Sequence, residues 1–333
     1  MLTIEYVLGF ISTAIANGTP LLFGAVGEIL TEKSGNLNLG TPGIMVVGGI
    51  SGIVGGSLYE GACHSAGITP IPILCVVIAL LSSLFGSTLL AFIYSFLTIT
   101  LKANQNVVGL ALTTIGVAIG PFYSQLLSNG KGSISLLDTA AAFKTKIPFL
   151  SDNLGLVGSS FFSFGFMIYL AVILAILTHF FLKKTRLGLN LRAVGENPAT
   201  ADAAGINVSR YKYLATCIGG AISGLGGLYF AMDYSVGGWA RSEVKIQEYG
   251  WLAIAIVIFA LWRPNLAILG SYIFGGLYVA SVKIPDLSSS EKELIKMLPY
   301  IVTIIVLVFV SARKKREHQP PASLGLSYFR EER

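Results

Sequence analysis

The sequence holds few of the residue patterns that carry out catalysis. It has no GxxxxGK[ST] phosphate-binding loop, because the similar run Asn129–Ser133 lacks the first glycine at the required spacing. It also has no GxSxG nucleophile turn and no HExxH metal motif. The histidines, His64, His179 and His318, are scattered, and the three cysteines show no CxxC spacing. These patterns predict no catalytic residue, no metal ligand and no enzyme.

The chemistry that remains is that of neutral amides and hydroxyls, which gather in two places. The first is the run Asn36–Gly43, with two Asn, two Gly and one Pro in eight residues, and the second surrounds Gln105. Neutral amide and hydroxyl groups can pair with base edges and sugar hydroxyls without holding a fixed ion. The alternative is that they form hydrogen bonds between helices.

A short helix with both ends marked lies in the segment 186–208. Asn197 can cap its start, Pro198 suits the first helical position, and Gly205 suits the residue just past the end. Alanines in between favour the helix, which is about 10 Å long over 198–204. Such a slim rod could enter a groove on another protein, and the alternative is a plain capped loop helix.

The elements that position these residues are set by the spacing of charge. Only 12% of the 333 residues are charged, and Gly61–Leu101 is uncharged for 41 residues. A helix needs about 20 apolar residues to cross a bilayer. The chain is therefore predicted to be an all-α polytopic helical membrane protein. The net charge of +6 is too small to indicate binding of nucleic acid.

We predict nine transmembrane helices, with a range of eight to ten, and we expect some of them to be broken. Pro20, Pro42 and Pro299 fall within the predicted spans. The pair on either side of Trp262–Asn265 could instead be re-entrant. The predicted spans are 6–30, 39–58, 71–99, 106–127, 160–182, 210–231, 247–262, 264–283 and 297–311.

The loops predict that the N-terminus lies outside and the C-terminus in the cytoplasm. This orientation places 15 of the 23 Lys and Arg residues on the inner side. Glu28 and Glu32 then lie at the inner end of the first span, and Asp233 lies at the outer end of the sixth. The absence of a mid-span acid or base counts against an ion-coupled transporter.

Two glycine-rich runs, Gly48–Gly56 and Gly219–Gly227, loosely echo each other. Small residues on one helix face allow close backbone packing. The alternative is that the two helices form a weak internal repeat beside a pore.

Three blocks of sequence resemble one family of membrane proteins. The family is the permeases of binding-protein-dependent ABC importers for ribose, branched-chain amino acids and nucleosides, and the chain looks closest to bacterial nucleoside permeases. The likeness runs over residues 8–312. The blocks are Glu32–Gly40, Arg192–Pro198 with Ala203–Asn207, and Tyr249–Ala255 with Ile258–Phe259 and Trp262–Pro264.

The resemblance implies a single permease domain over 1–312 in the cytoplasmic (inner) membrane of a bacterium. It implies two ATPase subunits that bind ATP and Mg, a second permease chain (sister or identical) and an extracytoplasmic solute-binding lipoprotein. This chain itself would hold no cofactor. The residues implied to couple to the ATPase are Glu196, Asn197, Pro198, Ala199, Thr200, Ala201, Asp202, Ala203, Ala204 and Gly205.

Within this interpretation the chain forms the path of a small neutral solute, most simply a nucleoside. Sugars and branched-chain amino acids remain alternatives, as do an ion-coupled secondary transporter or channel and a structural subunit that moves no solute. A transport site must be weak, since tight binding would trap the solute. The residues expected along the path are Asn36, Asn38, Thr41, Asn104, Gln105, Asn106, Thr113 and Thr114.

Two further segments carry expectations. The outer segment 128–159 is expected to form part of the docking surface for the binding protein, with a solvated cap as the alternative. The cytoplasmic tail 313–333 begins with Arg313–Arg316, which is expected to act as a positive-inside anchor.

Overall fold

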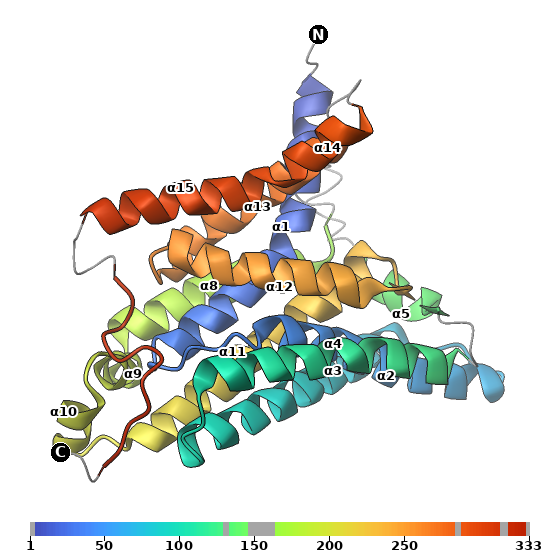
Figure 1. The fold of residues 1–333 in the computed structure, drawn as a ribbon. Coiled ribbons are helices and arrows are strands. Elements are labelled where there is room, and N and C mark those ends of the chain that lie inside the picture. Colours follow the sequence, from blue (N-terminus) through green and yellow to red (C-terminus); the bar gives the residue numbers. More distant parts are fainter. Residues whose placement is uncertain (1–3, 129–132, 146–163, 284–287, 314–318, 331–333) are drawn as a thin grey trace.

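Each of the nine predicted spans falls on a helix of the computed structural model, which describes residues 4–128, 133–145, 164–283, 288–313 and 319–330 (Figure 1). The prediction of a helical membrane protein is therefore confirmed. The nine helices are α1 (Ile4–Glu32), α2 (Thr41–Ser65), α3 (Pro72–Ser95), α4 (Gln105–Leu127), α8 (Phe166–Lys184), α11 (Val208–Tyr229), α12 (Ser242–Phe259), α13 (Pro264–Lys283) and α15 (Leu298–Arg313).

Six helices among the described residues are long and apolar enough to cross a bilayer: α1, α2, α3, α4, α8 and α11. Single π-helical stretches, η1 (Phe96–Thr100) and η2 (Phe230–Tyr234), extend α3 and α11. The remaining elements are short. They are β1 (Ile134–Ser135), α5 (Leu137–Phe143), α9 (Arg186–Glu196), α10 (Pro198–Ala203), β2 (Gly238–Trp239) and α14 (Ser289–Lys296).

The centre of the bundle is made by α2 and α11, which pack against each other through glycine. A Cβ atom added to Gly48 would lie 2.4 Å from the Cα atom of Gly224, and one added to Gly227 would lie 1.8 Å from the carbonyl oxygen of Met45. The two backbones therefore touch where the echoing glycine runs face each other. The prediction of close packing is confirmed for these two runs. Helix α1 packs on the other side of α11, with a Cβ on Gly27 falling 2.2 Å from the carbonyl oxygen of Gly219.

Two of the three predicted proline breaks are helix starts instead. Pro42 and Pro299 lie in the first turns of α2 and α15, where the missing N–H leaves no hydrogen bond unmade. Of these three prolines Pro20 alone lies inside a helix, α1, and a further proline, Pro121, lies inside α4. The break in the fold is residues 33–40 between α1 and α2, here called the broken segment. The prediction of an irregular run over Asn36–Gly43 holds for Asn36–Gly40, whereas Thr41–Gly43 form the first turn of α2.

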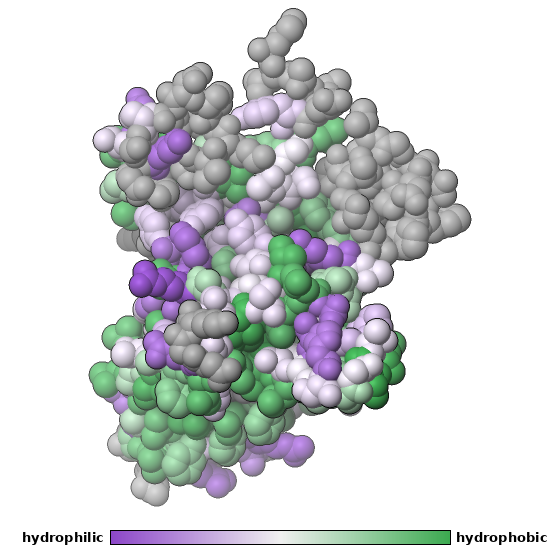
Figure 2. All heavy atoms as spheres, turned by 90° about the vertical axis from the view of Figure 1, so that its right-hand side faces the viewer, coloured by the Kyte–Doolittle hydropathy of each residue, from purple (hydrophilic) through white to green (hydrophobic). Residues whose placement is uncertain are grey.

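The outward faces of α3 and α4 are apolar. Leu81, Phe85, Val107 and Phe122 are among their most exposed side chains, at 61% to 72%. Figure 2 views the end of the bundle that carries α5, and hydrophobic side chains gather along the edge of its lower half. An apolar surface of this extent suits contact with lipid or with another membrane chain.

The end opposite to α9 and α10 is closed by α5 and by a short antiparallel pair in which Ile134 of β1 faces Trp239 of β2. Of the outer segment expected to dock a binding protein, residues 129–132 and 146–159 lie outside the described residues, so that expectation stays a prediction. In the described part, the Glu60 carboxylate of α2 accepts hydrogen bonds from the N–H and the hydroxyl of Thr139 in α5.

The contact between α2 and α11 predicts a strong contrast between two glycines of one helix. Gly48→Ala should lower the melting temperature of the purified chain by several degrees, because its Cβ meets backbone that cannot give way. Gly61→Ala in the same helix has nothing within 4 Å of the added Cβ and should leave the melting temperature unchanged or slightly raised. Equal effects of the two substitutions, measured by thermal unfolding in detergent, would contradict the packing.

Candidate functional site

Helix α10 has the ends that its sequence predicts. The side chain of Asn197 accepts a hydrogen bond from the N–H of Thr200 at 3.0 Å, and Pro198 opens the helix. Gly205 follows it with φ +82°, and the N–H of Ile206 reaches back to the carbonyl oxygen of Ala201 at 3.0 Å. This is a Schellman ending, in which the left-handed residue satisfies the last carbonyl groups. The prediction of a short capped helix is therefore confirmed, with its end at Ala203.

The other faces of α10 are open. Ala201 is the buried residue of the helix, and it packs with Val194 and Val208. The exposed residues around it are small or polar: Asn197, Ala199, Thr200, Ala203, Ala204 and Gly205. Pro198 and Asp202 are half-buried, and Glu196 is exposed. The part of the predicted coupling set that is exposed thus forms a slim ridge at one end of the bundle.

A second helix, α9, precedes this ridge, and the sequence did not indicate it. Gly188 and Gly195 weaken the helical signal of this segment in the sequence, because glycine is a poor helix former. The structure explains both of them by close approach: a Cβ on Gly188 would lie 2.0 Å from the carbonyl oxygen of Phe181, and one on Gly195 would lie 2.3 Å from that of Lys33. Helix α9 is thereby pressed against the end of α8 and against the broken segment.

The C-terminal residues 319–330 run along α9 and α10 (Figure 1, dark red). Ser323 donates from both its N–H (3.0 Å) and its hydroxyl (2.6 Å) to the carbonyl oxygen of Gly195. Asp202 of α10 accepts the hydroxyl of Tyr328 at 2.8 Å and lies 3.2 Å from Nε of Arg330. This part of the tail is thus packed onto the segment 186–208. Residues 314–318 and 331–333, which include most of the basic cluster, lie outside the described residues.

The tail also reaches the broken segment, where the N–H of Gly325 donates to the carbonyl oxygen of Gly35 at 3.1 Å. Because Gly195 touches Lys33 and Gly35 as well, the tail, the end of α9 and the broken segment form one contact unit.

Side chains satisfy the backbone of the broken segment. The N–H of Leu37 donates to Oε1 of Gln105 at 2.7 Å, and its carbonyl oxygen accepts the hydroxyl of Tyr94 at 2.6 Å. Further along, the carbonyl oxygen of Leu39 accepts the hydroxyl of Thr113 at 2.8 Å. A non-helical backbone inside a membrane protein requires such partners, since no bulk water is at hand.

Glu28 holds the same segment from the side of α1. Its carboxylate accepts the N–H of Asn38 at 3.2 Å and the hydroxyl of Thr41, and the residue is only 1% exposed. The sequence predicts that Glu28 lies at the inner end of its helix, but it does not indicate these partners. Its partners lie 10 and 13 positions away across an irregular turn, so no helical periodicity connects them.

The structure brings together five of the eight residues expected along a solute path and leaves three apart. Asn104 caps the start of α4, with its side chain accepting from the N–H groups of Asn106 and Val107. Asn106 and Thr114 lie on the exposed face of α4. The five that gather at the broken segment, all buried, are Asn36, Asn38, Thr41, Gln105 and Thr113.

Asn36 retains one unused acceptor. Its amide nitrogen donates to the hydroxyl of Thr216 at 3.0 Å, while its buried Oδ1 has no hydrogen-bond partner among the residues that the structure describes. Asn36 and Gln105 line a small cavity of about 20 Å³ together with Lys212 of α11. That volume has room for about one water molecule, so the conformation described is closed at this point.

A group that could hold a metal lies at the opposite end, where the sequence predicted none. Nε2 of His64 lies 3.0 Å from a carboxylate oxygen of Asp138, and Glu60 completes a set whose ligand atoms lie within 4.8 Å of one another. Distant chain segments create this cluster, so the spacing of the three residues in the sequence did not indicate it. Because the cluster is also explained by an ion pair and by the bonds from Thr139, we assign it no function.

The contacts of Glu28 predict a loss of stability. Glu28→Ala would leave the buried N–H of Asn38 without an acceptor, at about 1–3 kcal/mol, and would leave the Thr41 hydroxyl only its bond to the carbonyl oxygen of Asn38 at 3.2 Å. We therefore expect the melting temperature of the purified chain to fall by several degrees. Glu248→Ala is the matched control, because Glu248 is 40% exposed and paired with Lys245 at 3.0 Å, a surface pair worth at most about 1 kcal/mol. If both variants melt at the same temperature, the hydrogen bonds of Glu28 do not stabilise the fold as proposed.

Comparison with known proteins identifies the family of this architecture. The family described as "Branched-chain amino acid transport system / permease component" matches residues 10–307. The nucleoside ABC transporter permease protein NupC of Lactococcus lactis is 33% identical, over 89% of this chain and 90% of that protein. A putative glucose ABC transporter permease protein, TsgC13 of Haloferax volcanii, is 30% identical over 98% and 99%.

The guanosine ABC transporter permease protein NupQ of Bacillus subtilis is 29% identical over 97% of both chains. No solved structure matches the chain. The family match covers the whole bundle from α1 into α15, including the broken segment, α9 and α10. The chain therefore belongs to the family of branched-chain amino acid transport system permease components.

Proposed function

We propose that this chain is the permease subunit of an ABC importer for nucleosides and that α10 is its coupling helix. The observation that supports the proposal most is the exposed ridge of α10. This short helix of small residues is capped at both ends and stands at one end of the membrane bundle. The residues of this chain that we propose for contact with the ATPase are those of the coupling set, Glu196–Gly205. In this role the ridge sits in a groove of an ATPase subunit and receives the movement produced by its nucleotide cycle.

The energy source must lie in another chain. The sequence has no phosphate-binding loop, and its relatives are named as ABC transporter permeases. ATP and Mg are therefore held by the partner ATPase subunits, with no cofactor in this chain. A second permease chain, sister or identical, completes the path, and an extracytoplasmic solute-binding lipoprotein delivers the solute.

The same proposal sets the orientation. The α9–α10 end faces the cytoplasm, where the Lys and Arg residues of 183–192 add to the positive-inside excess. The N-terminus then lies outside and the tail 313–333 in the cytoplasm of a bacterial cell. The described part of that tail supports a role beyond a basic anchor, because it packs on α10 through Asp202.

A nucleoside is the solute that two relatives favour. NupC is named for nucleosides and NupQ for guanosine, whereas TsgC13, a putative glucose permease, makes a sugar the second candidate. The amide and hydroxyl groups that gather in this chain suit either solute, since both offer neutral hydroxyl groups.

We place the solute path along α4 and the broken segment. Asn106 and Thr114, two turns apart on an otherwise apolar exposed face, would meet the solute at the interface with the second permease chain. Asn36, Asn38, Thr41, Gln105 and Thr113 would then form the cytoplasmic gate, closed in this conformation. Asn104 acts by holding the first turn of α4.

The coupling role predicts that the backbone of Gly205 matters. Gly205→Val should uncouple ATP hydrolysis from uptake, because a β-branched residue is strained at φ +82° and the last turn of α10 would rearrange. We expect transport to fall by about ten-fold or more in reconstituted complexes. Gly205→Asn is the control, since Asn tolerates this conformation and space is open around the Cβ position. Full coupled uptake by the valine variant would reject the role of α10.

The solute assignment predicts which compound the importer takes up and which compound fails to compete. Vesicles that contain the whole importer should accumulate labelled guanosine or another nucleoside in the presence of ATP, and unlabelled glucose should not compete. Asn106→Leu should reduce this uptake several-fold without changing the basal ATPase rate. Glucose uptake that guanosine does not inhibit would assign the chain to sugars, and uptake by the chain alone under an ion gradient would reject the ABC mechanism.

A further inference from the structure

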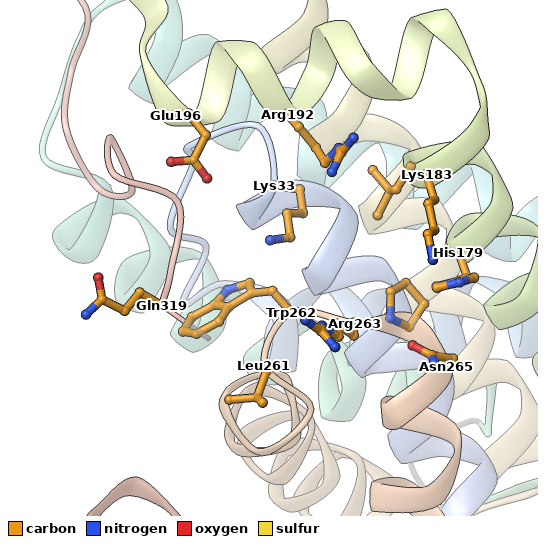
Figure 3. Close-up of a pocket in the computed structure, with 12 residues that line it drawn as sticks. Lys33, His179, Lys183, Arg192, Glu196, Leu261, Trp262, Arg263, Asn265 and Gln319 are labelled. Atoms are coloured by element: carbon orange, nitrogen blue, oxygen red, sulfur yellow. The ribbon is translucent and has the colours of Figure 1, made fainter. Parts of the chain in front are cut away.

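A basic cavity lies beside α9. Lys33 of the broken segment and Glu196 of the coupling set line it, whereas the five buried residues of the proposed gate do not. Its volume is about 630 Å³, and it opens where α1 and α8 end and where the turn between α12 and α13 meets α9. In Figure 3, Lys33 stands between Arg192 and Trp262, with Lys183 and His179 on one side and Glu196 on the other.

The charges around this cavity are unbalanced. Lys33, Lys183, Arg192 and Arg263 bring four cations from four different parts of the chain, and Glu196 is the one carboxylate among the described residues that line the cavity. Burial lowers the pKa of the Lys33 ammonium, the carboxylates of Glu196 and Glu32 raise it, and the guanidinium groups of Arg192 and Arg263 lower it. Positive groups held this close repel one another unless an anion lies between them.

One hydrogen-bond donor in the cavity wall lacks an acceptor. Nε of Arg192 is buried and has no hydrogen-bond partner in the described part of the chain. A buried donor of a charged group is costly to leave unpaired. Guanidinium groups match the geometry of phosphate oxygens, and ammonium groups add point charges beside them. The missing partner is therefore an oxyanion rather than a neutral solute.

The walls of the cavity are partly apolar. Leu182, Leu261 and Pro264 line it along with Trp262, whose indole N–H donates to Glu32. The cavity stands at the ends of α1 and α8, two helices long and apolar enough to cross a bilayer, so that in a membrane it would lie near the lipid headgroups. A ligand in this cavity would therefore contact both basic side chains and apolar side chains of the lining.

We propose that this cavity binds the phosphate group of an anionic ligand, and its position favours a phospholipid headgroup as the source. The phosphate would lie among Lys33, Arg192 and Arg263, with Lys183 at the rim. It would tie α9, and through α9 the ridge of α10, to the end of α1. This inference depends on the membrane topology and not on which solute the importer carries.

The test measures lipid binding to the purified full chain by native mass spectrometry. Wild-type chain should retain phosphatidylglycerol several-fold better than phosphatidylcholine. Arg192→Gln should weaken that retention by about ten-fold, because it removes a bond to a charged group. Nucleoside uptake is not a readout here, so failure of this proposal and failure of the proposed function are distinguishable.

Two neighbouring lysines supply a matched pair that avoids any loss of folding. Lys183 lines the cavity and Lys184 does not, and both are exposed. Lys183→Gln should weaken retention of phosphatidylglycerol by about five-fold, whereas Lys184→Gln should leave it unchanged. Equal losses in the two variants would overturn the site, since they would indicate only general surface charge.

A second arm distinguishes the source of the phosphate. Inorganic phosphate added to lipid-depleted chain should raise the melting temperature less than phosphatidylglycerol does, and the difference should vanish in Arg192→Gln. Equal stabilisation by inorganic phosphate would assign the cavity to a free phosphate and overturn the lipid source. No stabilisation by either compound would overturn the site itself.

Discussion

The structure depends on one constraint: backbone that leaves the helical form inside a membrane protein must find its hydrogen-bond partners within the chain. The broken segment is the main place where this constraint applies. The backbone groups of Leu37, Asn38 and Leu39 find their partners in Glu28 from α1, in Tyr94 from α3, and in Gln105 and Thr113 from α4. A small irregular stretch thus ties three long helices together, and none of them can move far without breaking a buried bond.

The same segment is the point of contact with the cytoplasm-facing elements in the proposed function. Gly195 at the end of α9 touches Lys33 and accepts two bonds from Ser323, and Gly35 accepts one from Gly325. A displacement of α10 would pass through α9 to the broken segment over a few residues. Such contiguity provides a short physical connection between the proposed ATPase contact and the proposed gate.

Much of the fold could be predicted from the sequence because the signals are local. Uncharged runs set the helices, and the cap residues Asn197 and Gly205 set α10 to within one residue of its end. The glycine runs predicted close packing but not the partner. Helix α9 was missed because Gly188 and Gly195 serve contacts with Phe181 and Lys33 rather than helix propensity. The roles of Glu28, Arg192 and the tail depend on residues far apart in the chain, and no periodicity relates them.

The central claim is that the chain is a passive gate operated through α10 by a partner ATPase. A photoreactive residue in place of Ala203, which is exposed on α10, tests this most directly in the assembled importer. The account predicts a cross-link to the ATPase subunit on illumination. The control places the same photoreactive residue at Leu58, which is exposed near the C-terminal end of α2, and should give no cross-link. A cross-link from position 58 but not from position 203, or labelling of position 203 from outside the cell, would contradict it.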